Sequence, residues 1–259
     1  MNREKLKALL DRKVMQFNQV TFIEADPVSI PHQFTKKQDI EIAAFFTAII
    51  SWGQRKTILQ SATRLMELMD FTPHDFLQNH TDQDLKRFEG FVHRTFNATD
   101  LYYLIHVLKF YYQKHEGLED LFLNAKATPS LGIRDKLIHF HNQVFDFDFA
   151  PERTRKHIAT PERNSACKRL NMFLRWMVRK DGNGVDFGIW ERITPQELMC
   201  PLDVHVHRVA LDLGLMSRTQ ADWKAAEELT AQLRLFCPDD PVKYDFALFG
   251  IGLESKHPQ

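Results

Sequence analysis

The spacing of apolar residues restricts the fold of this chain more than any other feature. Apolar side chains recur every three to four positions along almost the whole sequence, and an example is the segment IEIAAFFTAIISW from Ile40 to Trp52. Such spacing places apolar side chains on one face of a helix, whereas a half-buried strand needs strict alternation. Gly and Pro, which interrupt helices, number only 10 and 11 in 259 residues. The pattern predicts an all-α protein.

Several helix ends carry recognisable cap residues. Asn97 is expected to cap a long aromatic-rich helix that ends before Gly117. Further amphipathic helices are predicted over Ser130–Phe145 and Asn164–Lys180. Asp203 stands at the N-cap position of a helix that runs to Leu213, and an Asp at this place is more often a structural cap than a catalyst.

Composition limits the compartment and the cofactors. The sequence has no stretch of about 20 apolar residues that would span a bilayer. The N-terminal segment MNREKLKALLDRKVMQF is amphipathic and charged rather than a signal peptide, so we expect a cytoplasmic protein. Cys167, Cys200 and Cys237 are far apart and are interpreted as free thiols, too few for an iron–sulfur cluster. No cofactor is expected.

Charge is balanced overall but concentrated locally. The chain has 34 basic and 34 acidic residues, so an interaction with nucleic acid would have to depend on a local surface. Between Arg153 and Lys180 there are nine basic residues, and Glu162 is the only acidic one. From charge alone, a solvated polar face and a phosphate-contacting surface are equally favoured.

The helix predicted over Asn164–Lys180 has two distinct sides. One side is an apolar stripe of Leu170, Phe173, Leu174 and Met177. The opposite side carries Lys168, Met172, Arg175 and Arg179. Lys168 and the two arginines are therefore expected away from the core.

Two segments together resemble a known superfamily. Lys168 begins an amphipathic helix, and the segment PLDVHVHRV, residues 201–209, follows it. These segments resemble the core of the helix-hairpin-helix (HhH-GPD) DNA glycosylases, especially the archaeal 8-oxoguanine type. In that superfamily a Lys begins the helix after a hairpin, and an Asp begins a later helix within a Val-Asp-x-His-x-x-Arg-Val motif. Lys168 and Asp203 match these positions, and His205 and Arg208 match the later motif positions. The segment KRLNMFLRWMVR also resembles a bacterial family that has no assigned activity.

The hairpin itself departs from the superfamily pattern. The usual hairpin reads Leu-Pro-Gly-Val-Gly-x-Lys, whereas residues 162–168 read ERNSACK without either glycine. Asn164 can adopt the left-handed conformation, but Ala166 does so poorly. We therefore expect a remodelled hairpin.

The resemblance implies a fold and a reaction. It implies one helical domain over residues 1–259, with two lobes as an option, at about 40–150 and at 1–39 with 151–259. It implies base-excision repair on double-stranded DNA, with removal of a damaged base such as an oxidised purine and with AP-lyase activity as an option. Lys168 would attack the sugar C1′ carbon, and Asp203 would accept the amine proton and stabilise positive charge.

The resemblance also assigns supporting roles. The residues expected to contact DNA are Arg163, Asn164, Ser165, Arg169, His205 and Arg208. The candidates for a base pocket or a wedge are Trp52, Gln54, Trp190 and Phe246. Core packing explains the aromatic members of this second set at least as well.

Two other functions are compatible with the sequence. One is a DNA-binding protein without catalysis on the same fold. The other is a metal-dependent hydrolase, because Asp203-Val204-His205-Val206-His207 contains a His-x-His pair. The histidines would point about 200° apart on a helix, and too short a segment follows Asp203 for a β/α barrel. No metal site is therefore expected.

Overall fold

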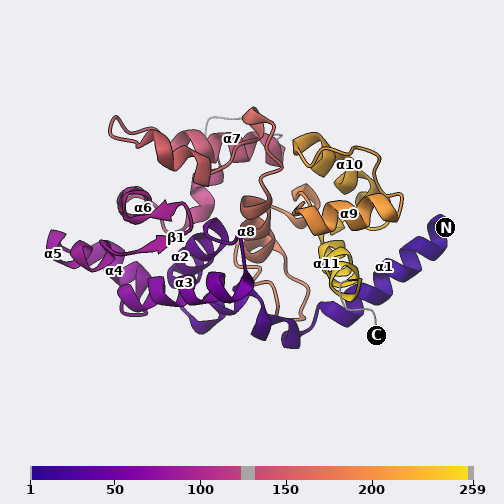
Figure 1. The fold of residues 1–259 in the computed structure, drawn as a ribbon, viewed down its shortest axis with the longest axis horizontal. Helices are drawn as coiled ribbons and strands as arrows, with labels where there is room; N and C mark the ends of the chain where they lie inside the picture. The colour runs from indigo at the N-terminus through magenta and orange to yellow at the C-terminus, as the bar shows by residue number, and fades with distance from the viewer. Residues whose placement is uncertain (1, 124–131, 256–259) are drawn as a thin grey trace. The chain divides into compact units, whose positions relative to one another are not determined.

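The described parts of the chain are predominantly helical, which confirms the predicted all-α class. A computed structural model describes residues 2–123 and 132–255 (Figure 1). The start of the predicted helix at Ser130 lies outside these ranges. The α-helices are α1 (Arg3–Phe17), α2 (Lys37–Ile49), α3 (Arg55–Leu68), α4 (Pro73–Asn79), α5 (Asp82–Leu85), α6 (Ala98–Tyr112), α7 (Ile133–Val144), α8 (Lys168–Val178), α9 (Val204–Asp212), α10 (Trp223–Arg234) and α11 (Tyr244–Glu254).

The chain divides into two compact units. Unit 1 consists of Met1–Glu24 and Thr160–Gln259, and unit 2 consists of Ala25–Ala159. Unit 1 is therefore built from the two ends of the sequence, and it contains α1 and α8 to α11. Unit 2 is continuous in sequence and contains α2 to α7.

In unit 1, α11 packs against both α1 and α9 (Figure 1). Small residues on α11 permit these contacts: Gly250 faces Phe17 of α1, and Gly252 faces Val209 and His205 of α9. The predicted apolar stripe of α8 is confirmed, because Leu170, Phe173, Leu174 and Met177 are all buried. Trp176 is fully buried as well. The side chains of α8 therefore lie in the core of unit 1 on more than one face.

In unit 2, α2 is buried around its whole circumference. Every residue from Ile40 to Ile49 is buried, and α2 contacts both α3 and α4. A helix that is apolar on all sides belongs in the centre of a unit. Its one buried acid, Glu41, accepts hydrogen bonds from the Tyr112 hydroxyl at 2.8 Å and from the Leu118 amide at 3.2 Å. These bonds compensate for the burial of its carboxylate.

A short antiparallel hairpin precedes α6. It pairs β1 (Val92–His93) with β2 (Phe96–Asn97), with Val92 opposite Asn97 and His93 opposite Phe96. Arg94 in the turn has φ +56°. The sequence did not predict this hairpin, because two-residue strands are too short to show alternation.

Within residues 2–123 and 132–255, none of the helices has both the length and the apolar character required to cross a membrane.

Candidate functional site

The loop before α8 has two residues with left-handed backbone conformation. Asn164 has φ +56°, as its residue type allows, and Cys167 has φ +48°. The Asn164 side chain donates to Asp222 at 2.9 Å, and its carbonyl accepts from the Trp223 amide at 3.1 Å. The beginning of α10 therefore holds this loop in place. Because Cys167 turns the chain, α8 begins at Lys168 and not at Asn164 as predicted.

Lys168 is the first residue of α8 and is half-buried. Its Nζ atom lies 3.3 Å from the Sδ atom of Met172, one helical turn further along. The N-terminal end of a helix carries a partial positive charge, which disfavours a second positive charge there.

Asp203 is the N-cap of α9. Its Oδ1 atom accepts hydrogen bonds from the amides of His205 at 2.8 Å and Val206 at 2.9 Å. The capping role foreseen for this residue is confirmed. Both bonds end on Oδ1, so the cap uses one of the two carboxylate oxygens, and the side chain is half-buried.

Asp245, the second residue of α11, is a buried carboxyl in unit 1. The pKa of its carboxyl is raised to about 6, and burial is the main cause. The positive charge of Arg175 lowers this pKa, the negative charge of Asp203 raises it, and the positive charge of Lys168 lowers it. Lys168 and Asp203 are thus both close enough to Asp245 for their charges to act on it. A buried carboxyl that titrates near neutral pH is a common feature of functional sites.

Sequence reasoning missed Asp245. The signal was present, because Asp245 is an acid at the start of the otherwise apolar run FALFGIGL. Isolated acids in such segments are rarely buried unless they are paired.

Arg175 of α8 and Arg179, which directly follows α8, are not on the surface. Arg175 is 4% exposed and Arg179 is 2% exposed, so the expectation that they face away from the core was wrong. Arg175 donates to Asp186 at 3.2 Å and to Asp245. Arg179 donates to carboxylates of Asp181, Asp186 and Asp240 at distances between 2.6 and 3.1 Å. These arginines are neutralised inside unit 1 and are not available to phosphates.

The other residues expected to contact DNA lie in unit 1. Arg163, Asn164 and Arg208 are exposed, whereas Ser165, Arg169 and His205 are half-buried. Arg208 donates to the Ser255 hydroxyl at 3.1 Å, and Ser165 accepts from the Cys167 amide at 3.2 Å. The exposed arginines are the members of this set that can reach a phosphate directly.

The aromatic residues expected in a base pocket have different surroundings. Trp190 is 3% exposed and lies edge-on to Phe173. Phe246 is fully buried, and the Arg175 guanidinium lies 4.3 Å from the centre of its ring. These two residues are part of the core of unit 1, so their positions give no base pocket. Trp52 and Gln54 belong to unit 2, where Trp52 is half-buried and Gln54 is exposed.

The cysteines are free thiols, and two of them are buried. Burial raises the pKa of Cys167 to about 12 and that of Cys200 well above its usual value. Neither thiol is therefore suited to act as a nucleophile. Within the described ranges, no group of three or more His, Cys, Asp or Glu side chains is placed to hold a metal ion.

The fold and site define a helical protein of two units with a lysine and two carboxylates gathered in one of them. The chain belongs to the family described as "Protein of unknown function (DUF2400)", which matches residues 26–254. No curated protein matches the chain, and no solved structure matches it.

The family match corrects the resemblance to HhH-GPD glycosylases. The family model that matches the chain, over residues 26–254, is that of DUF2400 and not that of the HhH-GPD glycosylases. A capping Asp before an apolar helix, and a Lys at the start of an amphipathic one, are features that ordinary helix formation also selects. The segment KRLNMFLRWMVR was expected to indicate a family without assigned activity, and the description of DUF2400 agrees with that expectation.

Proposed function

We propose that the protein removes a damaged base from double-stranded DNA, with Lys168 as the nucleophile and Asp203 as the carboxylate that assists it. The observation that carries this proposal is that Lys168 is the first residue of α8 and Asp203 is the N-cap of α9, and that both are half-buried in unit 1. The charges of both residues also influence the pKa of the buried Asp245 carboxyl. Attack at a sugar carbon by an amine needs a group nearby that accepts the amine proton, and a carboxylate is suited to this role.

The reaction begins when the damaged nucleotide leaves the base stack, which costs a few kcal/mol and least for damaged bases. The neutral Lys168 amine attacks C1′, and the bond from C1′ to the base breaks, with its electron pair leaving on the base. Asp203 accepts the proton that the amine loses, and it uses the carboxylate oxygen that does not cap α9. The nitrogen lone pair then forms a C=N bond at C1′ as the bond from C1′ to O4′ breaks, and O4′ takes the proton from Asp203, which gives a Schiff base. Loss of a proton from C2′ then allows the bond to the 3′ phosphate to break, which would add AP-lyase activity.

Asp245 acts as a positioning residue in this proposal. It is only 6% exposed and is held by Arg175, so it influences the reaction through Lys168 and Asp203. When Asp245 is ionised, its negative charge favours the protonated Lys168. When Asp245 is protonated, that attraction is lost and the neutral amine is favoured.

Exposed cations of unit 1 provide the contacts to DNA. Arg163 lies in the loop just before α8, and Arg208 lies on α9 close to Asp203 in sequence. Both are exposed, unlike Arg175 and Arg179. Phosphate contacts of this kind position a protein on DNA without selecting a sequence.

The test is borohydride trapping on duplexes that each carry one lesion: an oxidised purine, an oxidised pyrimidine or an abasic site. We expect a covalent adduct with at least one duplex for the wild type, and none for Lys168→Ala. Lys224→Ala is the matched control, since Lys224 is an exposed lysine near the start of α10 in the same unit. Base release is measured in parallel by alkaline strand cleavage.

A wild type that neither forms an adduct nor releases a base from any duplex contradicts the proposal, as does a Lys168→Ala variant with wild-type yields. Binding to the same duplexes without either product would instead support the non-catalytic DNA-binding function. The exposed Arg163 and Arg208 favour that alternative, since they serve binding whether or not Lys168 reacts.

A further inference from the structure

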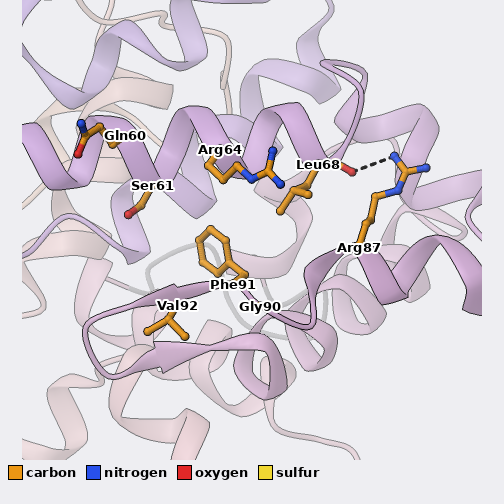
Figure 2. Close-up of a pocket in the computed structure, with 8 residues that line it drawn as sticks. All are labelled: Gln60, Ser61, Arg64, Leu68, Arg87, Gly90, Phe91 and Val92. Atoms are coloured by element: carbon orange, nitrogen blue, oxygen red, sulfur yellow. Dashed lines mark hydrogen bonds between the residues drawn. The ribbon is translucent and has the colours of Figure 1, made fainter.

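Unit 2 contains a pocket between α3 and the segment that leads into β1 (Figure 2). Its volume is about 320 Å³, and its lining includes Ser61, Arg64 and Leu68 of α3 and Arg87, Phe91 and Val92. A volume of this size is in the range of small-molecule sites. Nothing in the proposed action on DNA uses this pocket.

Ser61, in the pocket lining, is hydrogen-bonded to a buried histidine. The Oγ atom of Ser61 lies 2.9 Å from Nδ1 of His93, which is 1% exposed and ends β1. The other ring nitrogen, Nε2, lies 3.2 Å from the carbonyl oxygen of Trp52.

These two contacts assign the proton on the histidine ring. A carbonyl oxygen only accepts hydrogen bonds, so Nε2 must carry the hydrogen and donate it to Trp52. In a neutral ring Nδ1 is then the unprotonated nitrogen, and the Ser61 hydroxyl donates to it. The histidine is therefore oriented as a base toward the serine.

We propose that Ser61 is a nucleophile that His93 activates, and that this pocket hydrolyses small uncharged esters. A serine beside a base, with the base oriented by a third group, is the arrangement that nucleophilic catalysis by serine requires. Here the third group is the carbonyl of Trp52. This proposal is independent of Lys168 and of unit 1.

The reaction has two steps. Ser61 Oγ attacks the ester carbonyl carbon while its proton moves to Nδ1 of His93; the bond to the alcohol oxygen then breaks, and the alcohol takes that proton. In the second step a water oxygen attacks the acyl carbon, and the water proton moves to Nδ1. The bond between the acyl carbon and Oγ breaks, and Oγ regains the proton. The products are an acid and an alcohol.

The pocket lining indicates the kind of ester. Leu68, Phe91 and Val92 provide apolar contacts for a short acyl chain. Arg87 donates to the Leu68 carbonyl at 3.2 Å and to Asp70 at 2.8 Å, so its charge is already compensated and calls for no anionic substrate.

Arg64 is the second cation in the pocket lining. It is one helical turn from Ser61, so both side chains lie on the same face of α3. Its guanidinium also contacts Glu67, at 3.2 Å, on the exposed side of the helix. Like Arg87, Arg64 is therefore already paired with a carboxylate, which again suits an uncharged substrate.

The test is labelling with a fluorophosphonate, whose phosphorus forms a bond to an activated serine oxygen as fluoride leaves. We expect one adduct per chain, located at Ser61 by peptide mass mapping, and p-nitrophenyl acetate should give a burst of p-nitrophenol. Ser61→Ala should lose the adduct, and His93→Gln should slow labelling by about 100-fold or more. Ser217→Ala is the matched control, because that hydroxyl bonds to the Glu228 carboxylate and not to an imidazole.

Circular dichroism, recorded during thermal unfolding, is the measurement that checks whether Ser61→Ala is folded. If the buried His93 variant does not fold, the test rests on Ser61: the wild type must be labelled at Ser61, and folded Ser61→Ala must not be labelled. No adduct on the wild type, an adduct at another residue, or equal labelling of Ser61→Ala overturns the proposal.

Discussion

Arg175 on α8 donates a hydrogen bond to the Asp245 carboxylate on α11, and both side chains are buried inside unit 1. The same guanidinium also bonds to Asp186. Burial of the Asp245 carboxyl, together with the negative charge of Asp203, raises its pKa by more than the positive charges of Arg175 and Lys168 lower it. The pKa of Asp245 consequently remains at about 6, above the usual value of 3.8.

This raised pKa predicts how stability depends on pH. The folded state binds the Asp245 proton more tightly than the unfolded chain does, so the stability from this group is fully present below about pH 4 and is lost as pH rises through about 6. Asp245→Asn resembles the protonated form and does not titrate. From pH 4 to 7.5, we expect its free energy of unfolding to rise relative to the wild type by about 3 kcal/mol.

Urea unfolding at several pH values measures this difference. Asp212→Asn, at an exposed position, is the control, and parallel curves for Asp245→Asn and the wild type would contradict the prediction.

Substitutions of Asp203 separate its capping role from its proposed chemical role. Asn is as good an N-cap as Asp, so Asp203→Asn should leave thermal stability almost unchanged, whereas Asp203→Ala should lose about 1 kcal/mol. Asn cannot accept the amine proton, so both variants should reduce base release by about 100-fold or more. Melting temperature and single-turnover base release are the two measurements. Full activity in Asp203→Asn would mean that the carboxylate has only a structural role.

Salt should weaken binding to duplex DNA if Arg163 contacts a phosphate. Arg163→Ala should weaken binding to every duplex similarly and should reduce the slope of log affinity against log salt concentration by about 1. Arg12→Ala is the matched control, since Arg12 is exposed on α1 of the same unit. Fluorescence anisotropy at several salt concentrations provides the slopes. Equal slopes for the wild type and Arg163→Ala would remove this contact from the proposal.

Two glycines of α11 should respond in opposite directions to alanine. A Cβ atom at Gly250 would lie 2.1 Å from the Phe17 ring, so Gly250→Ala must displace α1 or α11 and should destabilise the protein by about 1 to 3 kcal/mol. At Gly252 the nearest atoms would be 3.6 Å away, which is ordinary contact. Gly252→Ala should therefore be neutral or stabilise by up to about 1 kcal/mol through helix propensity. Chemical unfolding compares the two variants, and equal effects would contradict the packing of α1 on α11.

Local sequence signals located several elements closely. Asn97 caps α6 and Asp203 caps α9, both as predicted. Periodicity and cap residues act over one or two turns, so one sequence contains them in full. The left-handed Cys167 was missed, because a Cys has no intrinsic preference for that conformation, and the surrounding structure must impose it.

The sequence by itself determined that the protein is helical, which faces of its helices are apolar, and that Asp203 begins a helix. Only the tertiary structure decided that Arg175 and Arg179 are buried, because sequence periodicity placed them away from the core. Carboxylates from distant parts of the chain, including Asp240 and Asp245, surround these arginines and make their burial possible. The same long-range packing brings Asp245 to Lys168 and Asp203, and Ser61 to His93. Such arrangements join residues from segments that are far apart in sequence, so no local sequence pattern predicts them.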